Sequence, residues 1–354
     1  MKRILTVAAW LFPCALIAGG LPHYEVDSSW PKPLPKDWHT GLIGGVCTDS
    51  HDHILVLNRH MPVDEDYKTL KQAPPMILFD MAGNVVSSWG DPKLVPTYIH
   101  GCVFDSDNNV WIGGRHDGMI QKYSHDGKLL LQIGMKGVYD SSDGSEKAAA
   151  LNSSQKGFYH PAGIAIDKAN GDIYVADGYG NRRVVVFDKT GKFLRQWGKQ
   201  ATDDEARAGV GGAFAKVVHC VVIGNDGLVY VCDRNGDRVQ VFDKMGKFQR
   251  NIWMIKDKSK VPDPGGTMWA AFSLDPQQKY MYVIDGVSKG IVILDHKNDQ
   301  VLSKIAFTPD LPSGGHTLAI DSKGDMYFDR DSDHMPRAKT DWGRRIQRLK
   351  PVTN

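Results

Sequence analysis

Cysteine is scarce in this chain and neither sign of charge dominates, and both shortages exclude classes of protein. The five cysteines among 354 residues include no CxxC pair, so they do not form the dense framework of a disulfide-stapled scaffold. Lys and Arg number 43 against 41 Asp and Glu. Without a basic surplus, neither nucleic acid nor an acidic membrane is indicated as a partner. We therefore expect a small-molecule or peptide-derived substrate.

Long apolar runs are also missing, apart from Ile4–Ile17. This run follows Lys2 and Arg3 and precedes Ala18 and two glycines, which is the layout of a cleavable secretory signal over residues 1–20. It falls short of the roughly 20 apolar residues that a membrane anchor needs. We expect residues 21–354 to be exported to the periplasm or the cell exterior, free of the membrane after cleavage, and monomeric.

Four cysteines remain after the predicted cleavage: Cys47, Cys102, Cys220 and Cys232. Cys220 and Cys232 flank an Asn-Asp-Gly turn symmetrically and could face each other across a hairpin. Cysteine is also a common buried residue in its free form. Of these two alternatives, buried free thiols are the expectation.

A repeated unit organises the chain. Its clearest copy reads HPAGIAID, GDIYVAD, RRVVVFD and KTGKFLRQWG, and an Asp or Gly that ends the first segment recurs at intervals of roughly 50 residues. The segments are rich in Val, Ile, Tyr and Phe and are separated by Gly-containing turns, which is typical of antiparallel hairpins. Six copies predict a single domain over residues 21–354, an all-β, six-bladed β-propeller with four-stranded blades. Irregular spacing places insertions around 61–74, 136–157, 199–213 and 331–341.

Histidines alternate through one position of the repeat. Five residues before each marker the chain has, in order, Gly44, His100, Ala162, His219, Ala270 and His316. This position precedes the first and innermost strand of each blade, so alternate blades would point three imidazoles into the central channel near one face. Three histidines with one open position are typical of a catalytic zinc site, and the small residues would leave space for a substrate. His160 is two positions out of register and is left out of the set.

Polar residues that follow the second strand of a blade should lie near the same face, because strands one and two are antiparallel. They are Arg59, Tyr179 and Arg234. Guanidinium groups suit a substrate carboxylate or a developing oxyanion, and a phenol beside a cation can transfer a proton. Asp177 and Asp233 precede two of these residues and are expected to cap turns.

With these motifs the sequence resembles the NHL-repeat propellers, and among them the peptidyl-α-hydroxyglycine α-amidating lyases. The zinc histidines of that family match His100 in IHGCVFD, His219 in VVHCVVIG and His316 in GGHTLAID. The family's active-site tyrosine motif matches ADGYGNRR around Tyr179, and its arginines match Arg234 in VCDRNGDR and, less closely, Arg59. The resemblance implies a zinc-dependent lyase that splits an α-hydroxyglycine amide into an amide and glyoxylate, with Tyr179 as the base.

Two departures from the family pattern concern its disulfide and its calcium site. Gly180 stands where the family has a cysteine after the tyrosine, and Thr317 stands where it has a calcium-binding Asp. Zinc is therefore expected and calcium is not. Three other interpretations stay open: a zinc-dependent hydrolase, a non-catalytic NHL propeller that binds protein or glycan, and a calcium-dependent lactonase, which the three histidines disfavour.

Overall fold

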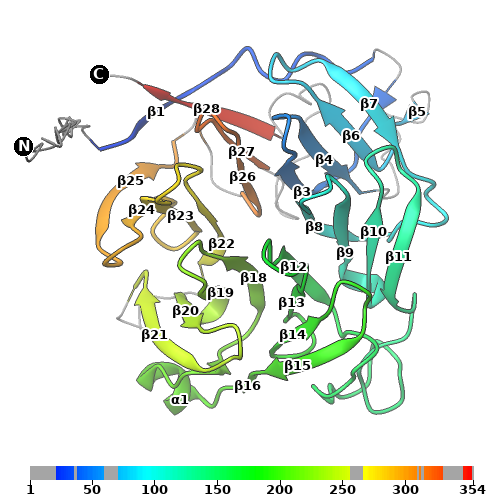
Figure 1. Cartoon of the computed structure of the whole chain (residues 1–354), viewed down its shortest axis with the longest axis vertical. Helices are drawn as coiled ribbons and strands as arrows, with labels where there is room; N and C mark the ends of the chain where they lie inside the picture. The colour runs from blue at the N-terminus through cyan, green and yellow to red at the C-terminus, as the bar shows by residue number, and fades with distance from the viewer. Residues whose placement is uncertain are drawn as a thin grey trace, which may run out of the picture.

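The computed structural model describes residues 21–35, 38–59, 71–255, 266–308, 311, 315–329 and 346–352. The predicted signal segment 1–20 lies outside these residues, as do most of the expected insertion at 61–74 and all of that at 331–341. Six four-stranded antiparallel sheets are arranged around one axis (Figure 1). The prediction of a six-bladed β-propeller is therefore confirmed.

Each of the first five blades uses four strands in chain order from the axis outward. Blade one contains β3 (Ile43–Thr48), β4 (Ile54–Asn58), β6 (Met76–Phe79) and β7 (Val85–Trp89). Blade two contains β8 (Ile99–Phe104), β9 (Val110–Gly114), β10 (Met119–Tyr123) and β11 (Leu129–Gly134). Blade three contains β12 (Pro161–Ile166), β13 (Ile173–Asp177), β14 (Arg183–Phe187) and β15 (Phe193–Trp197). Blade four contains β18 (Val218–Ile223), β19 (Val229–Asp233), β20 (Arg238–Phe242) and β21 (Phe248–Trp253). Blade five contains β22 (Thr267–Phe272), β23 (Tyr280–Asp285), β24 (Gly290–Asp295) and β25 (Val301–Ala306).

Blade six closes the ring with both ends of the chain. It combines β26 (Leu318–Ile320), β27 (Met326–Asp329) and β28 (Ile346–Val352) with the N-terminal β1 (His23–Val26), which pairs antiparallel with β28 (Figure 1). The Asp27 carboxylate then accepts a hydrogen bond of 3.0 Å from Arg348 Nε and lies 2.9 Å from Lys350 Nζ. The repeat pattern placed six copies in sequence order but did not show that the outer strand of the last blade comes from the N-terminus.

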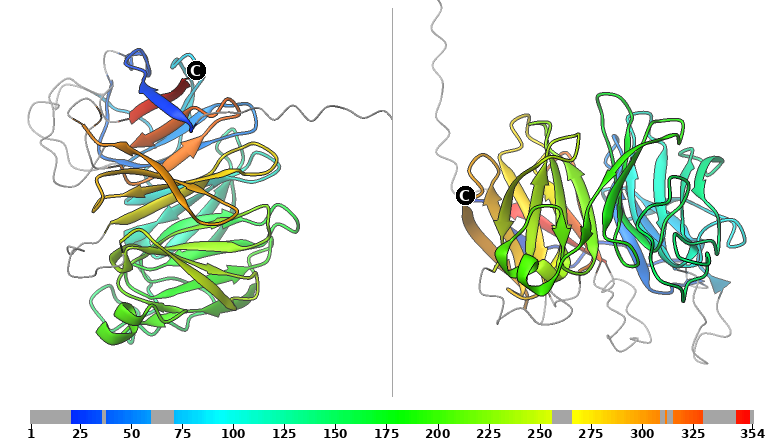
Figure 2. Two further views of the ribbon diagram at one scale, coloured as in Figure 1. Left: turned by 90° about the vertical axis from the view of Figure 1, so that its left-hand side faces the viewer. Right: turned by 90° about the horizontal axis from the view of Figure 1, so that it is seen from below.

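The blades pack face to face, and this explains their apolar strands. In β14, Val184 and Val186 pack with the core shared with blade four, whereas Val185 and Phe187 pack with the core shared with blade two. Both faces of a middle strand are therefore buried, so the sequence reads as a continuous apolar run and not as an alternating one. The inner strands contact one another in succession around the axis. Seen edge-on, the strands run between the two faces of the ring (Figure 2).

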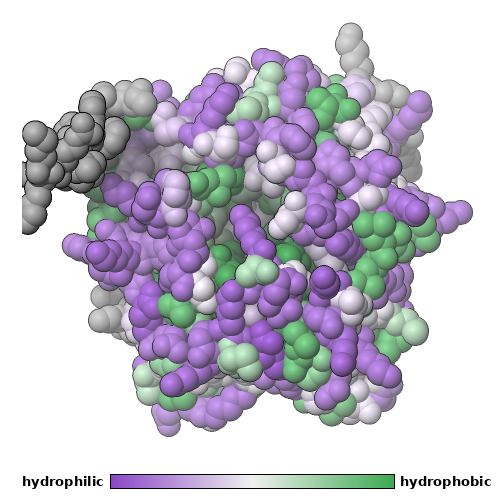
Figure 3. Space-filling view, viewed as in Figure 1, coloured by the Kyte–Doolittle hydropathy of each residue, from purple (hydrophilic) through white to green (hydrophobic). Residues whose placement is uncertain are grey.

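A few short elements lie outside the blades. Two-stranded parallel pairs join β2 (Trp38–His39) to β5 (Lys71–Gln72) and β16 (Lys199–Gln200) to β17 (Ala213–Phe214). The short helix α1 (Asp203–Ala208) begins with a capping box between Thr202 and Glu205. Within the described residues, no helix has the length and apolar character needed to cross a membrane. Polar side chains dominate the face shown in Figure 3, with apolar residues visible near its centre.

Two disulfides correct the expectation of free thiols. Cys220 in β18 pairs with Cys232 in β19, and Cys47 in β3 pairs with Cys102 in β8. The first bond lies across a hairpin, as the symmetric spacing around the turn allowed. The second joins the inner strands of blades one and two, which are neighbours only once the ring has formed.

Ion pairs join neighbouring blades at the face where the inner strands end. Asp49 of blade one lies 2.8 Å from His125 Nε2 of blade two, and Lys244 of blade four lies 2.6 Å from Asp167 of blade three. His296 of blade five lies 3.5 Å from Asp226 of blade four. His125, Lys244 and His296 occupy corresponding places after the third strand of their blades, so a repeated position supplies the basic side chain of each of these pairs, which we call interblade clasps.

Removing either disulfide should lower the free energy of unfolding, because a cross-link restricts the unfolded chain in proportion to the logarithm of its loop length. The separations of 55 and 12 residues correspond to losses of at most about 4 and about 3 kcal/mol. The measurement is chemical denaturation of the Cys47→Ala/Cys102→Ala and Cys220→Ala/Cys232→Ala variants. Transition midpoints equal to that of the oxidised wild type would contradict a stabilising role.

The clasp at His296 should make stability depend on pH. Burial opposes protonation of this imidazole, but Asp226 and the Gln278 carbonyl outweigh it and raise its pKa, while the pKa of Asp226 is lowered to about 2. A raised histidine pKa stabilises the fold below the unfolded value of about 6.5, and this contribution is lost as pH rises through the folded pKa. Because Asp226 is partly exposed, we expect a loss of no more than about 1 kcal/mol.

The matched variant is His296→Lys, which copies the natural Lys244 and keeps its charge above neutral pH. Urea unfolding at pH 5.5 and about pH 8.5 should show a smaller decline for the variant than for the wild type. The same decline in both proteins would mean that His296 does not carry the pH dependence.

Candidate metal centre

Three histidines from alternate blades meet on the axis of the ring, as their register predicted. His100 and His219 are the second residues of β8 and β18, and His316 lies two residues before β26. The pairing register shifts between His100 and Cys102 and again between Val218 and Val221. His100 and His219 therefore lie within the inner strands, at bulges that redirect side chains, and not before these strands as the sequence predicted, whereas His316 does precede its strand.

The three Nε2 atoms face one another around a phenol oxygen. His219 Nε2 and His316 Nε2 are 3.0 Å apart, and one ring nitrogen of each of the three histidines lies within 4.8 Å of the others. Ligands about 2.0–2.1 Å from a tetrahedral zinc ion are about 3.3 Å apart, so this donor set fits the metal. The hydroxyl oxygen of Tyr179 lies 2.9 Å from His219 Nε2, 3.0 Å from His316 Nε2 and 3.2 Å from His100 Nε2. Tyr179 thus covers the triad on one side.

Backbone carbonyls orient two of the imidazoles. The Ala162 carbonyl lies 3.3 Å from His100 Nδ1, and the Met268 carbonyl lies 2.5 Å from His219 Nδ1. A carbonyl accepts a hydrogen bond from the Nδ1–H group, which leaves the lone pair of a neutral imidazole on Nε2, directed at the centre. His316 is held through its backbone, since its amide donates to Asp329 Oδ1 at 3.0 Å.

Electrostatics keep the triad in the state that binds a metal. His100 and His219 are buried and His316 is half-buried, and burial, reinforced by the neighbouring imidazoles and arginines, holds the pKa of His100, His219 and His316 well below its ordinary value. They are therefore neutral at physiological pH. Metal ligation requires this form of histidine.

The motif around Tyr179 is a buried scaffold that positions the phenol. Asp177, the last residue of β13, accepts hydrogen bonds from Asn181 Nδ2 at 2.7 Å and Arg183 Nε at 2.9 Å. Its other oxygen accepts the Tyr159 amide at 2.9 Å. Gly180 is needed because a Cβ there would lie 2.4 Å from the Tyr159 ring. The loop is thereby fixed so that Tyr179 reaches the triad.

Blade four repeats this scaffold for Arg234. Asp233 ends β19 and accepts hydrogen bonds from Arg238 Nε at 2.8 Å and from the Ala215 amide at 2.9 Å. Both aspartates hold turns, in agreement with the expectation from the sequence. Arg234 Nη1 then lies 3.5 Å from the Tyr179 hydroxyl.

A third arginine, Arg115, was missed by the sequence reasoning. Its guanidinium carbon lies 3.6 Å above the centre of the Tyr179 ring, closer than that of Arg234 at 5.5 Å. Arg115 directly follows β9, as Arg59 follows β4 and Arg234 follows β19, so the rule that selected those two would also have found it. Arg59 is set further back: its Nε donates to the Ile99 carbonyl at 3.0 Å and its guanidinium stacks on Tyr98.

The small residue of blade one serves packing, which corrects the expectation that it leaves space for a substrate. A Cβ on Gly44 would lie 2.3 Å from the Ile99 carbonyl oxygen and 3.4 Å from Arg59 Nε. Gly44 therefore allows the close approach of β8 and Arg59. His160 also lies outside the triad, as predicted, and burial lowers its pKa to about 4.

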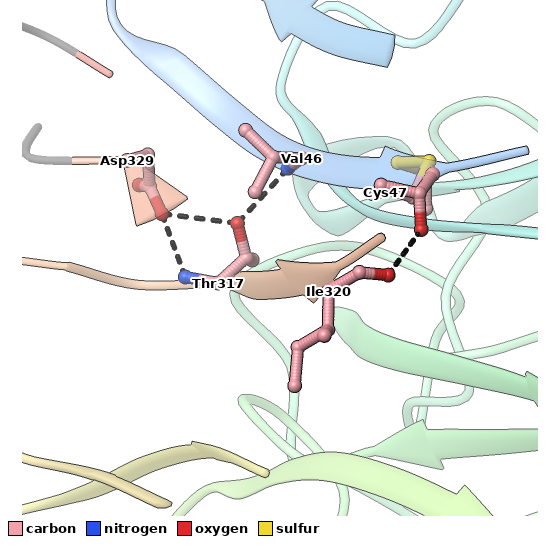
Figure 4. Close-up of a disulfide and its surroundings, with 7 residues drawn as sticks. Val46, Cys47, Thr317, Ile320 and Asp329 are labelled. Atoms are coloured by element: carbon pink, nitrogen blue, oxygen red, sulfur yellow. Dashed lines mark hydrogen bonds between the residues drawn. A yellow bond between two sulfur atoms is a disulfide. The ribbon is translucent and has the colours of Figure 1, made fainter. Parts of the chain in front are cut away.

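Thr317, which stands where the family has a calcium-binding Asp, takes part in a set of hydrogen bonds that we call the Thr317 strut. Its hydroxyl donates to Asp329 Oδ1 at 3.0 Å and accepts the Val46 amide at 3.0 Å, and its own amide also donates to Asp329 Oδ1 (Figure 4). Nearby, the Thr48 hydroxyl donates to the Ile320 carbonyl. These bonds join blades one and six beside His316.

Comparison with known proteins relates this arrangement to a family of repeats. The NHL repeat model matches residues 158–187, which include His160, Tyr179 and the Asp177 scaffold. Peptidyl-glycine alpha-amidating monooxygenase B of Xenopus laevis is 26% identical over 244 residues, or 65% of this chain. Peptidyl-alpha-hydroxyglycine alpha-amidating lyase 1 of Drosophila melanogaster is 24% identical over 236 residues, or 62% of this chain.

The matches cover 26% and 40% of the lengths of these two relatives. Among solved structures, a virginiamycin B lyase from Staphylococcus aureus superposes with a TM-score of 0.56 at 12% identity, covering 93% of this chain and 100% of the other. This likeness shows the propeller fold. The chain thus contains an NHL repeat and is similar, at low identity, to amidating lyases and monooxygenases.

Substitution of one triad histidine should abolish stoichiometric metal binding at the triad. We expect His219→Ala to contain about one zinc ion per chain fewer than the wild type when both are purified without added metal, because two imidazoles bind much more weakly than three. Elemental analysis measures both samples, and the same data should show no stoichiometric calcium. His125→Ala is the control, because His125 lies in a blade clasp; equal zinc in His219→Ala and the control would exclude the site.

Proposed function

We propose that this protein is an exported, zinc-dependent C–N lyase that cleaves an α-hydroxyglycine amide into an amide and glyoxylate. The observation that carries the proposal is the Tyr179 hydroxyl, which lies within 3.2 Å of the Nε2 atoms of all three histidines and beside Arg234 and Arg115. Low-identity similarity to amidating enzymes supports it. Two disulfides support export to an oxidising compartment.

The reaction requires one proton to leave the substrate hydroxyl and one to reach the departing nitrogen. As the hydroxyl loses its proton, its oxygen forms a carbonyl with the α-carbon and the C–N bond breaks. The nitrogen then takes a proton to complete the amide, so the sum is an amide plus glyoxylate. Tyr179 is the group placed to accept the first proton and return it to nitrogen.

The arginines give the site its preference for an anion. Arg115 and Arg234 approach Tyr179 from different blades, and they can pair with the substrate carboxylate. Arg59 lies behind them, held by the Ile99 carbonyl and Tyr98, and adds positive potential. A zinc ion held by His100, His219 and His316 would supply a Lewis acid for the developing oxyanion.

The same centre could serve a zinc-dependent hydrolase. A hydrolase would need room for a water molecule at the open side of the triad, where Tyr179 stands in this structure. The position of Tyr179 therefore favours the lyase. A non-catalytic propeller that binds protein or glycan would require neither the neutral triad nor its phenol.

Glyoxylate release from an N-acyl-α-hydroxyglycine tests the proposal. We expect activity in the zinc-loaded wild type and a loss of about 10²–10⁴-fold in kcat for Tyr179→Phe, the usual range for a general acid or base. The matched control is Tyr174→Phe in β13, the strand that precedes Tyr179, where the hydroxyl donates to the Lys244 carbonyl in the neighbouring blade's hairpin. Activity that survives in Tyr179→Phe would remove this residue as the base, and an inactive wild type would refute the lyase while leaving the metal centre standing.

A further inference from the structure

A second cluster of metal-ligating side chains lies on the same face as the triad. His116 follows Arg115 after β9, Glu146 lies in the 136–157 loop that joins blades two and three, and His160 precedes β12. One oxygen, Glu146 Oε1, lies 2.8 Å from His116 Nδ1 and 3.1 Å from His160 Nε2. The two imidazole rings are 5.0 Å apart. All three ligand atoms fall within 4.8 Å of one another.

The backbone and the side chain of His160 are more constrained than an ion pair on the surface would require. Its Nε2 atom is buried and has no aligned hydrogen bond, although it faces Glu146 Oε1. Its backbone has a φ of +62°, a left-handed conformation that is uncommon for a residue other than glycine. Tyr139 and Tyr159 pack against the ring and hold it in place. The left-handed backbone and the carboxylate oxygen that His160 shares with His116 together place its Nε2 atom as a ligand for a cation.

Hydrogen bonds hold the inserted 136–157 loop in place, so that Glu146 lies between His116 and His160. The Tyr159 hydroxyl donates to the carbonyls of Glu146 and Ala148, the latter at 3.1 Å, and the Tyr139 hydroxyl donates to the His116 carbonyl. The cluster is therefore built from a loop and two strand ends that are tied to each other. Separations of about 3 Å match donors that share one ion with bonds of about 2.0–2.2 Å.

A third cluster, formed by Asp49, His53 and His125, has a structural explanation that the second one lacks. Asp49 Oδ1 accepts the amides of His51 and His53 in its own turn, and its other oxygen makes the clasp with His125. Equivalent clasps with lysine or histidine join other blades. No such repeated role belongs to His116, Glu146 and His160, because the loop that carries Glu146 is an insertion.

We propose that His116 Nδ1, Glu146 Oε1 and His160 Nε2 form a second divalent-cation site that locks the 136–157 loop beside the channel. Two imidazoles and one carboxylate suit a borderline transition metal such as Zn²⁺ more than Ca²⁺ or Mg²⁺. The site is linked to Tyr179 and the triad through one covalent neighbour and one backbone hydrogen bond. His116 follows Arg115, which stacks on Tyr179, and the His160 carbonyl accepts the Tyr179 amide at 3.1 Å.

Zinc titration of the metal-free mature protein, followed by elemental analysis after dialysis, tests this site. We expect about two zinc ions per wild-type chain and about one in Glu146→Gln and in His116→Ala, with affinity for the second ion reduced at least about 10-fold. His219→Ala should keep the second ion while losing the first. His125→Ala should keep both, which separates this cluster from the Asp49 clasp.

Amide hydrogen exchange of the 136–157 loop gives a second measurement, independent of activity. Zinc in excess of one equivalent should slow exchange in the wild type and leave the loop of Glu146→Gln unchanged. Saturation of the wild type at one ion, or two ions retained in both Glu146→Gln and His116→Ala, would overturn the proposal. Neither result would affect the lyase assignment, which depends on the triad.

Discussion

Closure of the ring is the constraint on which the site depends. His100, His219 and His316 belong to blades two, four and six, and they can meet only if the sheets between them hold a fixed angle. That angle is set by six sheets that bury both faces against neighbours and by the pairing of β1 with β28. Asp27, which accepts a hydrogen bond from Arg348 and lies beside Lys350, strengthens the pairing of β1 with β28. The pairing between the two ends of the chain is therefore what holds the three histidines together.

One local arrangement recurs in blades three, four and six. An aspartate at the end of the second strand accepts a backbone amide that lies just before or at the start of the first strand: Asp177 from Tyr159, Asp233 from Ala215 and Asp329 from His316. In blades three and four, Tyr179 and Arg234 follow this aspartate and reach the triad. The same fold position therefore yields Tyr179 in one blade and Arg234 in another, and function varies through the side chain that follows a constant turn.

The two disulfides strengthen the strands that carry metal ligands. Cys102 lies two residues after His100, and Cys220 directly follows His219. Around these braced strands, neutral imidazoles stand among Arg59, Arg115 and Arg234, so the site combines a metal-binding set with a positive field. Such a field favours an anionic ligand or a developing oxyanion over a neutral one.

The sequence by itself determined the blades, the alternating histidines and the residues after each second strand. It could do so because a rotational repeat brings equivalent positions to equivalent places, so register alone predicts that His100, His219 and His316 converge. Contacts that break the repeat needed the tertiary structure: the Cys47–Cys102 bond, the pairing of β1 with β28, the packing role of Gly44, the Thr317 strut and the grouping of His116, Glu146 and His160. Each joins segments through the closure of the ring or through an inserted loop, and neither leaves a periodic signal along the chain. Arg115 lies between these cases, since its position follows the repeat but its stacking on Tyr179 depends on how two neighbouring blades pack.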